Sequence, residues 1–405
     1  MTGSPSRVDD ATEPFAGPPE YLGSLQFPRS CYVCKSRYRR VYSFYHALCP
    51  TCAAENWVRR HARADLGGRR ALMTGGRAKI GQEVVLRLLR DGADVTLTTR
   101  FPSDAADRFT AIEDYDDWSD RLHVVGIDLR QLDQVMRLAH EIADAGPLDI
   151  LINNAAQTVR RTAEAYGPLL AREQAGELPG VHDTRRMLTA RVDPSADDMP
   201  HLATGRRGDG DPVALDSSRR QGDVLIPSAT TAPDLDAGGL IPDRVPANSW
   251  SKKVDEIDPV EMLEVQLINV TVPFLLVSNL RAAMAAARSA RRYVVNVSAV
   301  EGQFGRHYKN PTHPHTNMAK AALNMLTRTS SPDLRRDGIY MNSVDTGWIT
   351  DERPYAQRAH EASAGFRAPL DLADGAARVY DPIVRGELGE EIFGCFLKDY
   401  GPAPW

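Results

Sequence analysis

Four cysteines near the start of the chain have the spacing of a metal site. Cys31 and Cys34 form one Cys-x-x-Cys pair, Cys49 and Cys52 form a second, and 14 residues separate the pairs. Four thiolates suit a closed, tetrahedral Zn²⁺ site with no open position for catalysis. The alternatives are two disulfides or a chance spacing, and a reducing cytoplasm argues against disulfides. The sequence therefore predicts one structural zinc ion.

A glycine-rich stretch has the composition of a phosphate-binding turn. It follows a short apolar run and opens an amphipathic helix. Backbone N–H groups and the dipole at a helix N-terminus favour an anion, and glycine lets a ligand approach the backbone. An ordinary strand-to-helix turn is the alternative. The candidate cofactor-binding residues here are Thr74, Gly75, Gly76, Arg77, Lys79, Ile80 and Gly81.

The elements that would position these residues alternate between strand and helix. Strands are expected at 71–73, 94–99, 123–127, 149–152, 293–297, 339–344 and 391–397. Helices are expected at 53–65, 259–290, 316–329 and 370–384. The long helix is expected to bury Leu263, Leu267, Val270, Phe274 and Leu275. Such alternation predicts an α/β fold with a Rossmann-type, doubly wound parallel sheet.

Composition divides the chain into four parts. Residues 1–20 are expected to be a disordered leader, and 21–66 the zinc module. The Rossmann domain is expected to combine 67–156 with 251–405. Residues 157–250 are rich in Pro, Gly, Asp and Arg, which predicts a partly disordered insertion, mobile over about 175–245. A binding role and simple tolerance of extra residues both remain open for this insertion.

The order of these features resembles the short-chain dehydrogenase/reductase family over residues 69–156 and 251–400. The glycine stretch is similar to that family's cofactor loop, and Asn153-Asn154-Ala155-Ala156 to its Asn-Asn-Ala-Gly run. The resemblance implies further cofactor contacts at Asp128, Asn154, Ala155, Ala156, Lys320 and Gly347. It also implies catalytic roles for Asn269, Ser298 and Lys320.

Three positions depart from the family pattern. Lys79 stands where the second loop glycine belongs, and Ala299 takes the second place of the usual Ser-Ser pair. Thr316 stands four residues before Lys320, where the family has its catalytic tyrosine. An alkyl hydroxyl is a far poorer acid than a phenol, so Thr316 does not simply replace the tyrosine.

The proton donor is therefore expected to have moved. The candidates are Tyr308 in the loop before the helix, and His313 and His315 directly before Thr316. Histidine needs little tuning to act near pH 7. Tyr308 keeps the family's chemistry and is slightly favoured, although it must fold back from the loop.

The resemblance implies an oxidoreductase that uses a nicotinamide cofactor on a small carbonyl or alcohol substrate. A catalytically silent dinucleotide-binding sensor or scaffold is the alternative. Thr99 and Arg100 stand where NAD-preferring enzymes carry an acid, and Arg77 lies in the glycine loop. This favours NADP, with NAD possible and solvated surface arginines as the alternative.

Charge and hydropathy bound the partners and the location. The net charge of −5 gives no reason to expect nucleic acid as the main partner. No run is expected to reach the roughly 18 apolar residues of a membrane span, and the start of the chain has no secretory pattern. We therefore expect a cytoplasmic protein without a membrane partner. The resemblance implies a homodimer or homotetramer.

Overall fold

The computed structural model describes residues 20–175, 183–186, 235–306 and 308–405. The strands are β1 Tyr21–Ser30, β2 Arg37–Tyr42, β3 Arg70–Thr74, β4 Asp94–Thr99, β5 Leu122–Gly126, β6 Ile150–Asn153, β7 Asp183–Arg186, β8 Arg292–Ser298, β9 Ile339–Asp345, β10 Phe396–Lys398 and β11 Gly401–Ala403. The helices are α1 Pro50–Arg60, α2 Lys79–Arg90, α3 Pro102–Thr110, α4 Leu132–Asp144, α5 Gly167–Gln174, α6 Pro259–Gln266, α7 Val272–Ala285, α8 Pro314–Leu334, α9 Tyr355–Ser363 and α10 Leu372–Glu387.

Nine of the described strands form one sheet in the order β11-β10-β9-β8-β6-β3-β4-β5-β7. Only β10 and β11 pair antiparallel in this sheet. From β3 the order runs outward through β4 and β5 on one side, and through β6, β8 and β9 on the other. The predicted doubly wound parallel sheet is confirmed, and its switch point lies between β3 and β6.

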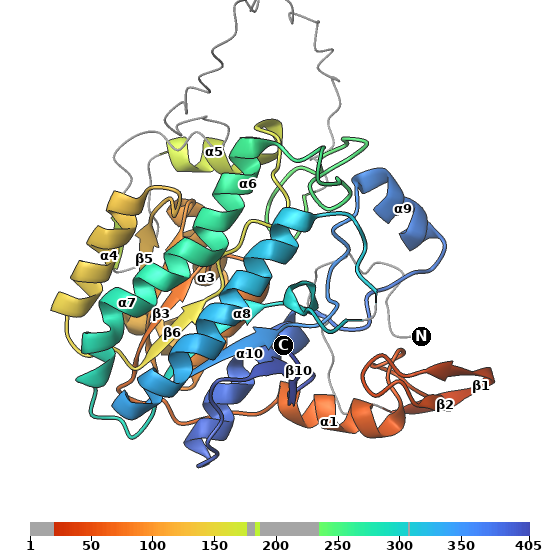
Figure 1. Ribbon diagram of the computed structural model, residues 1–405, viewed down its shortest axis with the longest axis horizontal. Coiled ribbons are helices and arrows are strands. Elements are labelled where there is room, and N and C mark those ends of the chain that lie inside the picture. Colours follow the sequence, from red (N-terminus) through yellow and green to blue (C-terminus); the bar gives the residue numbers. More distant parts are fainter. Residues whose placement is uncertain (1–19, 176–182, 187–234, 307) are drawn as a thin grey trace, which may run out of the picture.

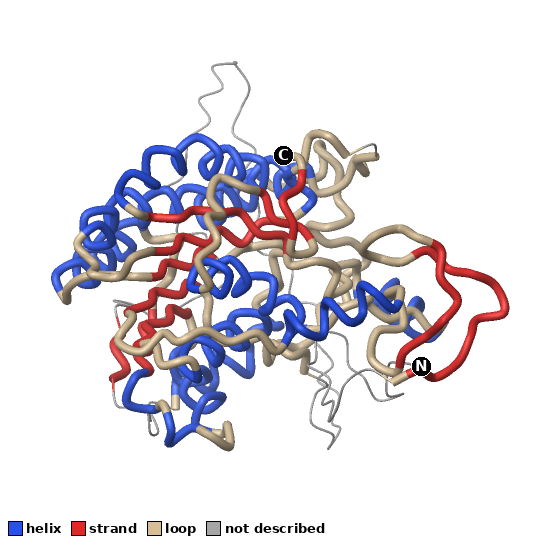
Figure 2. Tube along the Cα trace, turned by 90° about the horizontal axis from the view of Figure 1, so that it is seen from below, coloured by secondary structure: helices blue, strands red, loops and turns tan. Residues whose placement is uncertain are grey.

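Helices cover both faces of the sheet (Figure 1, Figure 2). The central strands are apolar along their length because both faces are buried; β6, for example, is buried at every residue. On one face, α2 and α10 enclose a cluster that includes Val84 and Ile383. On the other, α4, α7 and α8 enclose a cluster that includes Val135 and Leu276.

The first part of the described chain forms a small module beside the main sheet. Strands β1 and β2 pair antiparallel, and α1 follows them (Figure 1). The sequence analysis did not predict this hairpin, and it placed the helix at 53–65. In the structure the helix starts at Pro50, whose fixed φ suits a first helical turn, and ends at Arg60.

The expected leader and the centre of the insertion lie outside the described residues. Both flanks of the insertion are folded: α5 lies in one, and a turn around Asp236 lies in the other. The prediction of mobility over 175–245 falls mostly on residues that are not described; within this range the structure describes 175, 183–186 and 235–245.

The long central helix differs from its predicted form. It consists of α6, a π-helical turn at Leu267–Thr271 and α7. Leu263 is 37% exposed and Phe274 is 53% exposed, so the prediction that both are buried is wrong. Leu267, Val270 and Leu275 are only partly buried. A π turn contains more residues than an α turn and therefore shifts the buried stripe in the part of the helix that follows it, where Phe274 lies.

By length and composition, Pro259–Ala285 is long and apolar enough to cross a membrane, with a mean hydropathy of 1.6. By this measure the prediction that no such segment exists is wrong. One such helix is weak evidence of a span, because core helices pass the same test. Leu276 and Leu280 of this helix are fully buried in the cluster beneath α4.

Candidate cofactor site and metal centre

The loop between β3 and α2 holds glycines at positions that admit no side chain. A Cβ on Gly81 would lie 2.1 Å from the carbonyl oxygen of Gly75, and one on Gly76 would lie 2.7 Å from Leu97 Cβ. Gly75 has a φ of +70°, which also favours glycine. The loop is therefore drawn tightly to the N-terminus of α2, where backbone N–H groups favour an anion.

Lys79 keeps the backbone shape of the glycine that it replaces. Its φ is +55°, in the left-handed region. Its ammonium lies 3.6 Å from a carboxylate oxygen of Asp236, in the second flank of the insertion. Its neighbour Ile80, in the first turn of α2, is partly buried and packs against two apolar clusters, that between α2 and the sheet and that of the cysteine module.

Hydrogen bonds join this loop to the end of β6. Thr74 Oγ1 accepts from the backbone N–H groups of Asn154 and Ala155, at 3.0 and 3.1 Å. The side-chain amide of Asn154 donates to the carbonyl oxygen of Gly75 at 2.9 Å. The structure therefore brings Thr74, Asn154 and Ala155 together with the glycines.

A cavity of about 330 Å³ opens beside the loop, above the ends of β3, β4 and β5. Its walls come from the glycine loop, the ends of β4 and β5, the stretch after β6, and both flanks of the insertion. The side chains that line it include those of Arg77, Lys79, Arg100, Asp128, Ala156 and Tyr166. The carboxyl ends of strands at a switch point are the usual ligand site of such sheets.

Two arginines and two aromatic rings line one end of this cavity. Arg77 forms an ion pair with Asp104. Arg100 lies 3.2 Å from the hydroxyl of Tyr166, and its guanidinium lies 5.0 Å from the centre of that ring. Phe101 and Tyr166 stack with their ring centres 5.8 Å apart. This end of the cavity is cationic and aromatic.

Asp128 lies at the carboxyl end of β5 and is buried. Arg130 pairs with its carboxylate at 2.7 Å. Burial by itself would raise the pKa of Asp128, but the hydrogen bonds and charge of Arg130 hold that pKa below its usual value. The group therefore stays an anion that accepts hydrogen bonds beside the cavity.

Lys320 is bonded to β8, and Asn269 is bonded to the stretch that follows β6. The Lys320 ammonium donates to the carbonyl oxygen of Val297 at 2.8 Å, and burial lowers its pKa to about 8 against the opposing charge of Glu301. Asn269, in the π turn, accepts from the backbone N–H of Gln157 at 2.8 Å and donates to its carbonyl.

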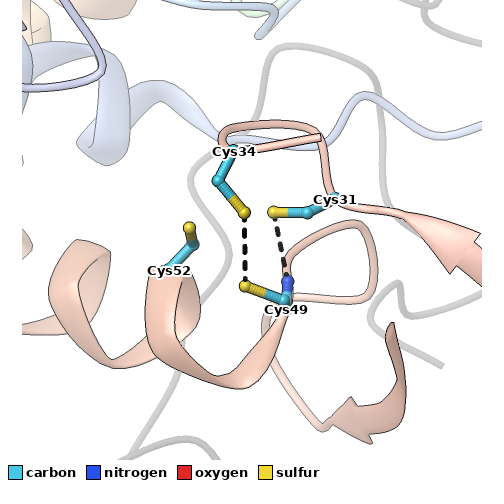
Figure 3. A group of neighbouring side chains, drawn as sticks. All are labelled: Cys31, Cys34, Cys49 and Cys52. Carbon is cyan, nitrogen blue, oxygen red and sulfur yellow. Dashed lines mark hydrogen bonds between the residues drawn. The ribbon is translucent and has the colours of Figure 1, made fainter. Parts of the chain in front are cut away.

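The four cysteine sulfurs gather in one place (Figure 3). All four Sγ atoms lie within 4.8 Å of one another, and those of Cys34 and Cys49 are 3.7 Å apart. A tetrahedral Zn²⁺ with Zn–S bonds of about 2.3 Å separates its sulfurs by about 3.8 Å. The Cys49 N–H also donates to Cys31 Sγ at 3.2 Å, which is a common way to stabilise a thiolate. The donor set and its spacing fit zinc.

Comparison with known families identifies the fold family. Residues 69–168 match the family model described as short chain dehydrogenase, and residues 245–370 match the one described as enoyl-(acyl carrier protein) reductase. Together these matches cover more than half of the chain. The chain belongs to the short-chain dehydrogenase/reductase family.

Relatives of this short-chain dehydrogenase/reductase differ widely in coverage. The chain is 31% identical over 373 residues to R665, an uncharacterized protein of Acanthamoeba polyphaga mimivirus. This match covers 88% of the chain and 71% of the viral protein. The chain is 39% identical over 105 residues to a probable oxidoreductase of Streptomyces lividans, of which the match spans only 34%.

Solved structures agree on the fold. The carbonyl reductase Sniffer of D. melanogaster superposes with a TM-score of 0.50 at 18% identity, over 84% of this chain and all of that one. A short chain dehydrogenase from Burkholderia cenocepacia, solved in complex with NADP, gives a TM-score of 0.50 at 18% identity over 82% of this chain and 97% of its own.

Two hydroxyl-bearing residues that the family resemblance places near the reacting centre are buried in this short-chain dehydrogenase/reductase. Ser298 donates from Oγ to Asn324 Oδ1 at 2.7 Å, a buried bond between β8 and α8. Thr316 Oγ1 is buried and has no hydrogen-bond partner among the described residues. Both hydroxyls are therefore held in the interior of the protein.

The candidate proton donors lie in different surroundings. Tyr308 is 73% exposed, and no hydrogen bond ties it to Lys320 in the described part of the chain. His315 is buried with Nε2 3.7 Å from a carboxylate oxygen of Glu261. His313 stacks on Trp250 with ring centres 4.0 Å apart, and burial lowers its pKa. The structure leaves the choice among them as a prediction.

Two residues near these sites were not singled out from the sequence. Glu301 follows β8 by three residues, and its charge acts on Lys320, Asp345 and His313. Tyr166 comes from the insertion and lines the cavity. Glu301 could have been found by its place after a strand end, whereas no local signal marks Tyr166.

Proposed function

We propose that this family member binds NADP(H) and exchanges hydride between the nicotinamide and a small carbonyl or alcohol substrate. The observation that carries the proposal is the cavity beside the glycine loop, whose cationic end presents Arg77 from that loop and Arg100 from the end of β4, where an acid would select NAD. A guanidinium pairs well with a 2′-phosphate. When bound, the nicotinamide supplies the hydride chemistry.

The chain's own residues would bind and orient. The glycine loop presents N–H groups to the diphosphate, and Asp128 accepts a hydrogen bond from the adenine. Lys320 binds the ribose that carries the nicotinamide, beside Gly347 at the end of β9. Asn269 is already bonded through both side-chain atoms to Gln157, so its part is to fix that stretch beneath the site.

Proton transfer would come from Tyr308, His315 or His313 rather than Thr316. A general acid needs a pKa not far from the working pH, which an alkyl hydroxyl lacks. His315 is buried beside Glu261 and so already has a defined position. Tyr308 is exposed, and its loop would have to fold inward before it could donate a proton.

The test is a titration of the purified protein with NADPH and with NADH, followed by hydride exchange with a panel of carbonyl compounds. We expect tighter binding of NADPH and turnover of at least one carbonyl. Equal or tighter binding of NADH would contradict the NADP preference. Binding of neither nucleotide would overturn the proposed function as a whole.

A silent NADP-binding protein is the second candidate. It is favoured by Thr316 and Ala299, because both usual hydroxyl donors of the family are replaced in this chain. This candidate predicts cofactor binding without hydride exchange. Tyr308→Phe and His315→Ala decide between relocation and silence: one of them must lower a turnover that the unchanged protein shows.

We further propose that the four cysteines hold a structural zinc ion. Four sulfurs leave no coordination position for a substrate. Zinc binding needs the four thiols reduced. We also propose a cytoplasmic location, because a reducing compartment keeps thiols available for zinc.

A further inference from the structure

The cysteine module does not stand apart from the catalytic fold. Its apolar core includes Ile349 and Leu370 from the segment between β9 and α10, Leu372 at the start of α10, and Cys31 and Leu48 of the module itself. Ile80, in the first turn of α2 directly after the glycine loop, packs against the same cluster. One apolar cluster therefore joins the module to the loops on two sides of the cofactor site.

A single hydrogen bond fixes the start of that segment. The backbone N–H of Trp348 donates to Tyr32 Oη at 2.8 Å, across 316 residues of sequence. Tyr32 lies inside the first Cys-x-x-Cys turn. A Cβ on Gly347 would lie 3.4 Å from the same Oη and 2.6 Å from Leu370, so the chain turns tightly against the module here.

Ion pairs fix the end of the segment. Arg60, at the end of α1, pairs with both carboxylate oxygens of Asp371 at 2.6 and 2.9 Å. Asp371 caps the N-terminus of α10. Tyr45 of the module donates to Asp374 at 2.7 Å, one turn further on. All these side chains are buried, so the module holds residues 347–374 at both ends.

The position of this segment relative to the sheet indicates which half of the cofactor site it borders. The cavity lies mainly over the ends of β3, β4 and β5, on one side of the switch point, and reaches across it only to the stretch after β6. The segment after β9 lies on the other side, where β6, β8 and β9 end together. A dinucleotide spans the two sides of such a sheet, one mononucleotide on each. The held segment therefore borders the half opposite the adenosine cavity.

We propose that the four-cysteine module acts as a fixed support for the nicotinamide half of the cofactor site, with Tyr32 as its positioning residue. This inference rests on the proposed NADP binding. The Tyr32 hydroxyl holds Trp348 and, through it, Gly347 in the place where the nicotinamide half must fit. The adenosine half depends on other residues, so the two halves should respond separately.

The experiment compares two ligands on two matched variants. NADPH occupies both halves of the site, whereas 2′,5′-ADP occupies only the adenosine half. Tyr32→Phe removes the hydroxyl that meets Trp348. Tyr38→Phe removes a hydroxyl of the same module that bonds to the carbonyl oxygen of His46, within the module. Binding is followed by calorimetry, and amide exchange at Trp348 by mass spectrometry.

We expect Tyr32→Phe to weaken NADPH binding by about threefold to tenfold, the loss that follows when the stabilisation from one hydrogen bond within the protein is passed on to the bound ligand. Its affinity for 2′,5′-ADP should stay unchanged, and exchange at Trp348 should speed up. Tyr38→Phe should bind both ligands as the unchanged protein does.

Unchanged NADPH affinity in Tyr32→Phe, or an equal loss for both ligands, would overturn the inference while leaving the proposed function standing. An equal selective loss in Tyr38→Phe would also overturn it, because the effect would then belong to the stability of the module. Failure of the unchanged protein to bind either ligand would overturn the proposed function, and the inference with it.

Discussion

Lys320 is the residue whose surroundings most constrain the chemistry. It is buried, it donates to the carbonyl of Val297, and Glu301 is the charge that opposes the effect of its burial. With a pKa of about 8, the Lys320 ammonium loses its proton at slightly alkaline pH. Its charge, which the proposed contact with the ribose would use, therefore depends on pH in the working range of many enzymes.

The pH dependence of stability should report this lysine. Its pKa falls from 10.5 to about 8 on folding, so between these values the unfolded chain binds more protons than the folded one. The free energy of unfolding therefore rises with pH across that window, by about 1.4 kcal/mol for each unit of pKa shift. Lys320→Met should remove this rise in urea unfolding curves. Exposed Lys253→Met is the control, and a rise that persists in Lys320→Met would contradict the assignment.

Arg100 should carry the preference for NADP. Its guanidinium lies at the cationic end of the cavity, against Tyr166. Arg100→Ala should weaken NADPH by about tenfold to a hundredfold, as the loss of a charge-assisted hydrogen bond does, and leave NADH nearly unchanged. Arg90→Ala serves as the control. Arg90 is the last residue of α2, at the end away from the glycine loop, and forms an ion pair with Asp114 there. An equal loss for both nucleotides would mean that Arg100 has only a structural role.

At the scale of elements, both flanks of the insertion reach the cofactor cavity. Tyr166 precedes α5 and stacks on Phe101, and the turn at Asp236 brings a carboxylate to Lys79. These flanks add a wall that the ends of β3, β4 and β5 do not supply. We therefore predict a binding role for the two ends of the insertion, which is the first of the two alternatives left open for it.

Truncating Tyr166 tests this wall. Tyr166→Leu should weaken 2′,5′-ADP by about threefold to tenfold, the range of a lost aromatic contact. Tyr166→Phe keeps the stacked ring and loses only the bond to Arg100, so it should lose less. If Tyr166→Leu binds as the unchanged protein does, the flank covers the cavity without contacting the ligand.

The cysteine module should contain metal. Elemental analysis should find about one zinc ion per chain, because four thiolates make one closed site. Cys52→Ser should lower both zinc content and the stability of the module, since metal binding and folding are linked. Cys395→Ser, which changes a cysteine outside the cluster, is the control. A zinc content near zero with intact thiols would refute the assignment.

At the scale of the whole molecule, α7 and α8 carry exposed apolar side chains. Phe274, Met318 and Met325 are each more than half exposed, and these two helices lie side by side (Figure 1). The family resemblance implies pairing through these helices. We therefore predict that the protein is a homodimer or homotetramer.

Light scattering after gel filtration should give a mass at least twice the 44.6 kDa of one chain. Phe274→Asp places a charge on this face and should shift the mass toward one chain, because an unpaired charge is costly in an interface. Val58→Asp, on the exposed side of α1, is the matched control. A single-chain mass for the unchanged protein would contradict the prediction.

The sequence by itself determined what depends on short spacings. The Cys-x-x-Cys pairs, the turn from Thr74 to Gly81 and the alternation of apolar strands and helices are local patterns. The predicted second strand, 94–99, matches β4 residue for residue. The prediction of the last strand at 391–397 is wrong over most of its length: β10 is only Phe396–Lys398, and 391–395 form a loop although they include apolar residues.

Only the tertiary structure decided what depends on distant contacts. Tyr166 meets Phe101 and Tyr32 meets Trp348 because the sheet order brings their loops together, and no local pattern encodes that order. The π turn reversed the expected burial of Phe274, since one turn of altered pitch rotates all that follows. The exposure of Tyr308 and the burial of His315 are likewise set by how the loop before α8 packs on residues 248–252, which lie more than 50 residues away in the chain.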